Sequence, residues 1–336
     1  ANSRNSLIGN YHGTSSEYIT VLEGIREEAG DDVRILYSQG CDLYKDKVEN
    51  LAWDQDRISE AVITAENSDV VILCVGLNET LEGEEGDTGN SDASGDKVDL
   101  HLPKVQEELI EKVTAVGKPT IVVLMAGSAI DLNYAQDNCN GILLAWYPGA
   151  RGGRAIADLL FGKESPSGKL PITFYKDLEG MPEFTDYSMK NRTYRYMEKE
   201  ALYPFGYGLT YSDTCVTEAE VVGEVSAESD IMLKATVKNN GTVDTDEVVQ
   251  VYIKDLDSPL AVRNYSLCGF KRVSLKAGEE KSVEFTISNK AMNIVDEDGN
   301  RYIAGKHFRL FAGVSQPDTR SAELTGHKPA EIEIAL

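Results

Sequence analysis

The chain has 336 residues, enough for about two domains. Its 33 lysines and arginines stand against 56 aspartates and glutamates, and the net charge of −23 makes nucleic acid and anionic membrane surfaces poor partners. The hydrophobic fraction of 41% fits a globular fold, and no apolar run is long enough to span a bilayer.

The first half of the chain alternates helix-like with strand-like stretches. Apolar residues at helical spacing predict helices over 16–29, 56–67, 103–116 and 154–161. Short β-branched runs, apolar on both faces, predict buried parallel strands over 33–37, 70–75, 120–125 and 141–145. This alternation predicts an α/β sandwich domain over residues 1–163, in which helices cover a parallel sheet.

After about Ser212 the pattern changes to strands of period two with no helical periodicity between them. The runs that show it are 231–237, 248–253, 282–287 and 307–314, and Asn-Gly, Ala-Gly and Asp-Gly turns lie between them. These strands predict a β-sandwich of the fibronectin-III or immunoglobulin type over residues 216–336. The intervening stretch 164–215, rich in Pro, Gly and Tyr, is expected to be an ordered wrapping connection.

A long acidic loop, residues 77–102, follows the strand predicted at 70–75. Strand-to-helix loops are usually only a few residues long, and ligands of open parallel sheets bind at the carboxyl ends of the strands. The loop carries one cation, Lys97, and these carboxylates: Glu79, Glu82, Glu84, Glu85, Asp87, Asp92, Asp96 and Asp99. Crowded carboxylates raise one another's pKa, which can produce a general acid. A solvated acidic loop, or a Ca²⁺ loop whose spacing departs from the usual pattern, are the alternatives.

Several motifs in the first 211 residues resemble one family in combination. They are LEGEEGDTG with SGDKVDLHLPKVQEELI, AWYPGARGGRAIADLLFGKESPSGKLPITF, NRTYRYM and ALYPFGYGLTYS. Together they resemble the C-terminal half of glycoside hydrolase family 3, and the later strands resemble that family's fibronectin-III-like domain. The resemblance implies a retaining exo-β-glycosidase for β-linked glucose, xylose and related sugars. Its active site would lie between a (β/α)₈ barrel, which supplies an Asp nucleophile, and this α/β domain, which supplies a Glu acid/base.

The acid/base falls within the LEGEE motif. Family members often place it directly after a small residue, which indicates Glu84 after Gly83. Glu82 is the second candidate and Glu85 the third. The resemblance implies an oligosaccharide substrate, with a xyloside slightly favoured over a glucoside, and neither a cofactor nor a metal.

The barrel that the family uses is not part of this sequence, because such a barrel takes about 250 residues and the chain opens inside the α/β domain. We therefore expect the barrel in cis or on a separate chain, and we expect this chain alone to be inactive. The remaining hypotheses are a non-catalytic carbohydrate-binding or interaction module, and a Ca²⁺-dependent adhesion protein.

The histidines and cysteines, which could bind metals or act in catalysis, are scattered along the chain. The histidines, His12, His101, His307 and His327, support neither a zinc site nor a catalytic triad. The five cysteines form no CxxC pair, and no signal peptide is visible, which together favour free thiols and the cytoplasm. Trp146 and Tyr147, at the end of the strand predicted at 141–145, either pack at an interface or stack on a sugar.

Overall fold

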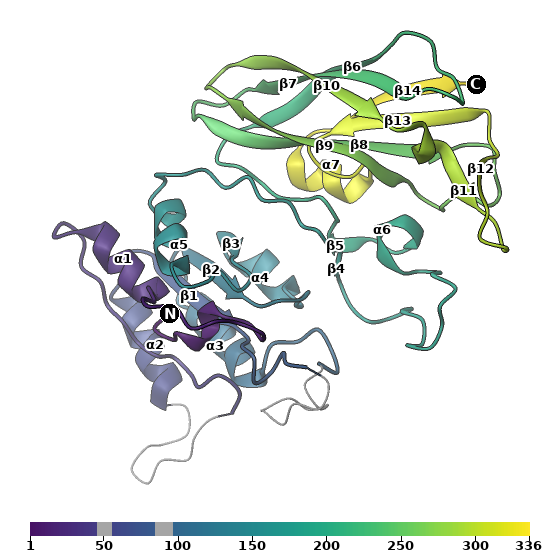
Figure 1. The fold of residues 1–336 in the computed structure, drawn as a ribbon. Helices are drawn as coiled ribbons and strands as arrows, with labels where there is room; N and C mark the ends of the chain where they lie inside the picture. The colour runs from purple at the N-terminus through teal and green to yellow at the C-terminus, as the bar shows by residue number, and fades with distance from the viewer. Residues whose placement is uncertain (46–55, 85–96) are drawn as a thin grey trace. The chain divides into compact units, whose positions relative to one another are not determined.

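The computed structural model describes residues 1–45, 56–84 and 97–336 (Figure 1). This part of the chain separates into two compact units. The first comprises Ala1–Lys163 with Lys176–Leu178, and the second comprises Glu164–Tyr175 with Glu179–Leu336. The stretch 164–215 thus lies almost wholly in the second unit, and a folding boundary near Ser212 stays a prediction.

The first unit is built on a parallel sheet with the strand order β1-β2-β3. The strands are β1 (Val71–Gly76), β2 (Thr120–Met125) and β3 (Gly141–Leu144). The helices are α1 (Val21–Ala29), α2 (Asp56–Glu66), α3 (Lys104–Thr114), α4 (Asn133–Asn138) and α5 (Gly152–Leu160), with a short 3₁₀ turn η1 (Asn5–Leu7). Val21 of α1 and Ile156 of α5 pack with Val123 and Met125 of β2. The expected α/β architecture is confirmed.

Helix α1 begins later than the apolar spacing indicated. The Thr20 side chain accepts a hydrogen bond from the Glu23 backbone N–H, and the Glu23 carboxylate accepts one from the Thr20 N–H at 2.8 Å. This capping box fixes the start of the helix at Val21, so the prediction of a helix from residue 16 is wrong by five residues.

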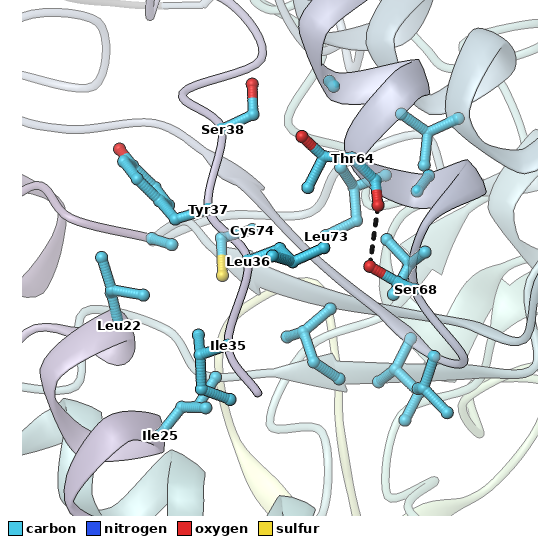
Figure 2. A pocket seen from close by; sticks show the side chains of 18 of the residues that line it. Leu22, Ile25, Ile35, Leu36, Tyr37, Ser38, Thr64, Ser68, Leu73 and Cys74 are labelled. Carbon is cyan, nitrogen blue, oxygen red and sulfur yellow. Dashed lines mark hydrogen bonds between the residues drawn. The ribbon is translucent and has the colours of Figure 1, made fainter. Parts of the chain in front are cut away.

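The strand predicted over residues 33–37 does not form. The segment has no regular secondary structure and pairs with no strand in the described ranges. It borders a cavity of about 650 Å³ that residues of β1 also line, and Figure 2 shows Ile35 and Leu36 beside this cavity, with Thr64 and Ser68 of the α2 region among the other lining residues.

The second unit is a β-sandwich of two antiparallel sheets, as expected (Figure 1). One sheet has the order β10-β7-β6 and the other β14-β13-β8-β9. The strands are β6 (Thr214–Val222), β7 (Ile231–Asn239), β8 (Thr245–Asp255), β9 (Ser266–Leu275), β10 (Glu280–Ile287), β13 (His307–Gly313) and β14 (Ala330–Ala335). Its core includes Val237, Val251, Phe308 and Leu310, all completely buried.

Smaller elements complete this unit. They are β4 (Phe174–Tyr175), α6 (Thr193–Tyr196), β5 (Ala201–Tyr203), η2 (Asn289–Met292), β11 (Asn293–Val295), β12 (Arg301–Ile303) and α7 (Thr319–Thr325). Helix α7 overturns the expectation that no helix interrupts the strands. It is short and polar, and it depends on a cap in which the Asp318 carboxylate accepts from the Ser321 N–H at 2.6 Å.

Two observations cover the whole described structure. The five cysteines are free thiols, as the sequence indicated. None of the helices in residues 1–45, 56–84 and 97–336 is long and apolar enough to cross a membrane.

Candidate active site

Three loops of the first unit meet at the carboxyl edge of its sheet. They follow β1, β2 and β3 and carry Glu82, Gly127 and Tyr147 respectively. Because parallel strands end at the same edge, residues far apart in the sequence come together there. The acidic loop therefore begins where the sequence analysis placed it.

Glu82 joins the three loops. Its carboxylate Oε2 accepts a hydrogen bond of 2.7 Å from the Gly127 backbone N–H and one of 2.6 Å from the Tyr147 hydroxyl. The other oxygen, Oε1, is buried and has no hydrogen-bond partner within the described residues. Burial, followed by the hydrogen bond to Glu82, raises the pKa of Tyr147, so its hydroxyl remains a donor at neutral pH.

The backbone around Tyr147 is shaped to hold this contact. Trp146 has φ of 52°, a left-handed conformation that is strained for a large side chain and turns the chain sharply after β3. Gly127 must lack a side chain, because a Cβ there would lie 2.8 Å from Cε2 of Tyr147 and 3.2 Å from Oε2 of Glu82. The sequence placed Trp146 and Tyr147 at the strand end but did not pair Tyr147 with Glu82.

Glu84 lies two residues further along the loop in a different environment. Its side chain is exposed, and its Oε2 accepts a hydrogen bond of 2.5 Å from the hydroxyl of Tyr11. Tyr11 is 82% exposed and belongs to the N-terminal segment, which the sequence analysis did not connect with the loop. Of the three candidates, Glu85 lies outside the described residues.

The far end of the acidic loop returns to the same edge. Lys97 donates a hydrogen bond of 2.8 Å to the carbonyl of Ala129, two residues after Gly127. Burial lowers the pKa of Lys97, and the negative charges of Glu82 and Asp99 partly oppose this shift. The only cation of the loop is thus used to attach it to the turn after β2.

The described residues contain no group of three or more His, Cys, Asp and Glu side chains placed to hold a metal ion. The carboxylates on which a Ca²⁺ loop would most depend, Glu85, Asp87, Asp92 and Asp96, fall outside the described ranges. The edge instead offers a fixed carboxylate, Glu82, beside an exposed one, Glu84.

Comparison with known proteins identifies the two parts of the chain. Residues 1–211 match the glycosyl hydrolase family 3 C-terminal domain, and residues 247–316 match a fibronectin type III-like domain. A beta-xylosidase of Formosa agariphila is 34% identical over 95% of this chain and 43% of its own length. A periplasmic beta-glucosidase of Salmonella typhimurium is 30% identical over 94% of this chain and 44% of its own.

Solved structures give the same result. A β-glucosidase from Erythrobacter marinus superposes with a TM-score of 0.81 at 30% identity, over 98% of this chain and 44% of the other. A family 3 β-glucosidase from Bifidobacterium adolescentis gives 0.79 at 29% identity, over 97% and 47%. The chain therefore spans less than half the length of these relatives. The matched domains and the shared fold show that the chain belongs to glycosyl hydrolase family 3.

Proposed function

We propose that this chain supplies the general acid/base, Glu84, of a retaining exo-β-glycosidase whose nucleophile lies on a (β/α)₈ barrel. The observation that carries the proposal is the contrast between two neighbouring carboxylates at the sheet edge. Glu82 holds the loops after β2 and β3, whereas Glu84 is exposed at the same edge.

The division of roles follows from these contacts. If Glu82 moved to protonate a substrate, the hydrogen bonds from Gly127 and Tyr147 would be broken together, and each contributes about 0.5–3 kcal/mol. The side chain of Glu84 is exposed, and the Tyr11 side chain that donates to it is exposed as well, so Glu84 can turn toward a substrate without leaving a buried position. Glu82 is then a positioning residue, which fixes the start of the loop from which Glu84 projects.

The chemistry assigned to Glu84 has two steps. Its protonated carboxyl first donates a proton to the glycosidic oxygen while the barrel carboxylate attacks the anomeric carbon, and the leaving sugar departs as an alcohol. The resulting carboxylate then takes a proton from a water molecule, whose oxygen attacks the anomeric carbon, so that the bond to the barrel carboxylate breaks and the sugar is released. In a retaining enzyme the two carboxyl groups lie about 5–5.5 Å apart.

The proposed substrate is a terminal β-linked xylose or glucose of an oligosaccharide. Relatives carrying the names beta-xylosidase and beta-glucosidase support this class. We also propose that this chain alone does not turn over p-nitrophenyl β-xyloside or β-glucoside, because the nucleophile would come from the barrel. Robust turnover by the purified chain would contradict this division.

The assignment of Glu84 is tested in the enzyme that joins this chain to its barrel. Glu84→Ala should slow substrates with poor leaving groups by about 10²–10⁴-fold, but slow activated aryl glycosides much less, because the latter need little protonation. The slowing that remains with aryl glycosides should come from deglycosylation, which loses its general base, and azide should restore that turnover by attacking the glycosyl–enzyme without base assistance.

Glu82→Ala and Glu85→Ala serve as matched controls in the same enzyme. Glu82→Ala should lower both activity and stability, and azide should not rescue it. Azide rescue of the Glu82 or Glu85 variant instead of the Glu84 variant would assign the acid/base role to that other glutamate. Full activity of all three variants would show that this loop does not supply the acid/base.

A further inference from the structure

Tyr11 contacts Glu84 from outside the acidic loop. It belongs to the N-terminal segment that precedes helix α1, and its hydroxyl donates a hydrogen bond of 2.5 Å to Oε2 of Glu84. The Tyr11 side chain is 82% exposed, so it buries little apolar surface that would stabilise the fold. The reason for a tyrosine at this position therefore lies in its hydroxyl contact more than in packing.

The backbone at Tyr11 is strained. Its φ of 56° lies in the left-handed region, which is unfavourable for a large side chain. The Tyr11 N–H donates to Oδ1 of Asn10 at 2.9 Å, and Nδ1 of His12 lies 2.8 Å from the carbonyl oxygen of Gly9. These contacts hold residues 9–12 in a tight turn. Strained backbone of this kind gathers at functional sites, where the surrounding structure holds a side chain in a set direction.

Two contacts anchor this turn to the loop after β3. The carbonyl of Leu7, a completely buried residue, accepts a hydrogen bond of 2.7 Å from the Gly149 N–H. Gly9 packs against the ring of Tyr147, since a Cβ at Gly9 would lie 2.6 Å from Cδ2 of that ring. Tyr147 is also the residue that donates to Glu82. The turn is therefore packed on the same side chain that fixes the start of the acidic loop.

The exposure of Glu84 explains what the contact with Tyr11 adds. An exposed glutamate samples several rotamers, and few of them direct its carboxyl group at a given point. A general acid transfers its proton only from within hydrogen-bond reach of the leaving oxygen, and the rate falls steeply when the reacting groups are misplaced. A hydroxyl that holds one carboxyl oxygen restricts these rotamers.

We propose that Tyr11 is a positioning residue for Glu84 and that the packing of Gly9 on Tyr147 keeps it in place. Its hydroxyl holds Oε2, so that Oε1 gives its proton to the glycosidic oxygen and later takes one from the attacking water. Tyr11 itself exchanges no proton with the substrate. The inference rests on the proposed role of Glu84 and adds a second segment of the chain to that site.

A double-mutant cycle in the enzyme that joins this chain to its barrel tests the coupling. The measured quantity is kcat/KM for a phenyl and a dinitrophenyl β-glycoside, because the phenyl leaving group needs protonation and the dinitrophenyl group needs little. Tyr11→Phe should lower the value about tenfold for the phenyl glycoside and less than about twofold for the dinitrophenyl glycoside. In the Glu84→Ala background the same change should have no further effect beyond about twofold.

Three further variants separate positioning from a general loss of structure. Tyr134→Phe removes a hydroxyl that contacts Thr114 and should change kcat/KM for neither substrate. Gly9→Ala displaces the turn and should repeat the selective loss with the phenyl glycoside, whereas Gly13→Ala should not, because an added Cβ there meets nothing within 4 Å. The melting temperature of Tyr11→Phe should stay within about 2 °C of the wild type, because the side chain is exposed.

Several results would overturn the inference. These are an equal loss with both glycosides in Tyr11→Phe, no loss with the phenyl glycoside, the same loss in the wild-type and Glu84→Ala backgrounds, or unchanged selectivity in Gly9→Ala. Failure of the proposed function is recognised separately, because Glu84→Ala would then show no preference for the activated leaving group. In that case the role of Tyr11 is contradicted together with that of Glu84.

Discussion

At the scale of single residues, two tyrosine hydroxyls contact two neighbouring glutamates under very different conditions. Tyr147 is partly buried and donates to Glu82, which also accepts from the backbone of Gly127. Tyr11 is exposed and donates to Glu84. The same deletion of a hydroxyl should therefore have different consequences at the two positions.

We expect Tyr147→Phe to destabilise the protein by about 1–3 kcal/mol, because it removes one of the two donors to a carboxylate whose other oxygen already lacks a partner within the described residues. Tyr11→Phe should change stability by less than about 0.5 kcal/mol, since its side chain is in water, but should alter activity of the barrel-containing enzyme. Urea unfolding of both variants measures the difference. Equal destabilisation would mean that Glu82 does not join the loops.

At the scale of secondary-structure elements, helices α1 and α5 pack closely against each other at glycine positions. A Cβ on Gly24 of α1 would lie 2.2 Å from the carbonyl oxygen of Gly153, and one on Gly153 of α5 would lie 2.0 Å from that of Thr20. Backbone atoms cannot move aside as the end of a side chain can. The two glycines therefore set the distance between the helices.

In Gly24→Ala, the gain in helix propensity opposes the clash between the new Cβ and the backbone of Gly153. Alanine in a helix interior is favoured by about 0.5–1 kcal/mol over glycine, whereas overpacking costs about 1–3 kcal/mol. We expect net destabilisation in urea unfolding because the clash is with backbone. Gly13→Ala, where an added Cβ meets nothing within 4 Å, is the control and should be nearly neutral. Stabilisation by Gly24→Ala would show that the helices can separate without loss.

The start of α3 should respond to pH. His101 hydrogen-bonds Glu107 at 2.9 Å, and this contact is the main reason that the pKa of His101 is raised above its usual value. The stabilisation is therefore complete below the unfolded pKa of about 6.5 and lost as pH rises through the folded pKa. Glu107→Gln should lose up to about 1 kcal/mol more stability at pH 5.5 than at pH 8.5, because the pair is exposed. Glu111→Gln on the same helix should show no such difference.

The sequence revealed those elements whose signals are local. Strands β1, β2 and β3 were predictable because they are short apolar runs buried on both faces. Strand β9 was missed because it lies at a sheet edge and most of its residues are at least partly exposed, which weakens the alternation. The segment 33–37 has the composition of a strand, but composition does not show whether a neighbouring strand pairs with it, and in the described structure none does.

For the candidate site, too, the sequence shows the residues within one loop but not the contacts made across the fold. The position of Glu82 and Glu84 follows from the order of strand, loop and helix along the chain. Tyr11 and Tyr147 carry no signal in the sequence that pairs them with these glutamates, because they are brought there by the tertiary fold across 73 and 65 positions of the chain.

At the scale of the whole molecule, the stretch 164–215 contributes to the structure of the second unit. Tyr194 stacks on Phe205 with ring centroids 4.2 Å apart and lies edge-on to Tyr252, which is completely buried in β8. Asn264, before β9, donates to the carbonyls of Tyr194 and Met197. The sandwich strands alone would expose this aromatic cluster.

We therefore expect a polypeptide of residues 164–336 to be more stable than one of residues 216–336. The shorter one should still give an all-β circular dichroism spectrum, because the core around Val251 and Phe308 remains intact. It should unfold at a lower urea concentration, because it lacks both Tyr194 and Phe205, whose partly buried rings pack on the cluster around Tyr252 and Tyr265. It should also bind a hydrophobic dye at Tyr252 and Tyr265, which the truncation would expose.

Equal urea midpoints and no dye binding would place the folding boundary near Ser212 and would show that the connection adds no stability to the sandwich. A helical spectrum from the shorter polypeptide would contradict the sandwich itself.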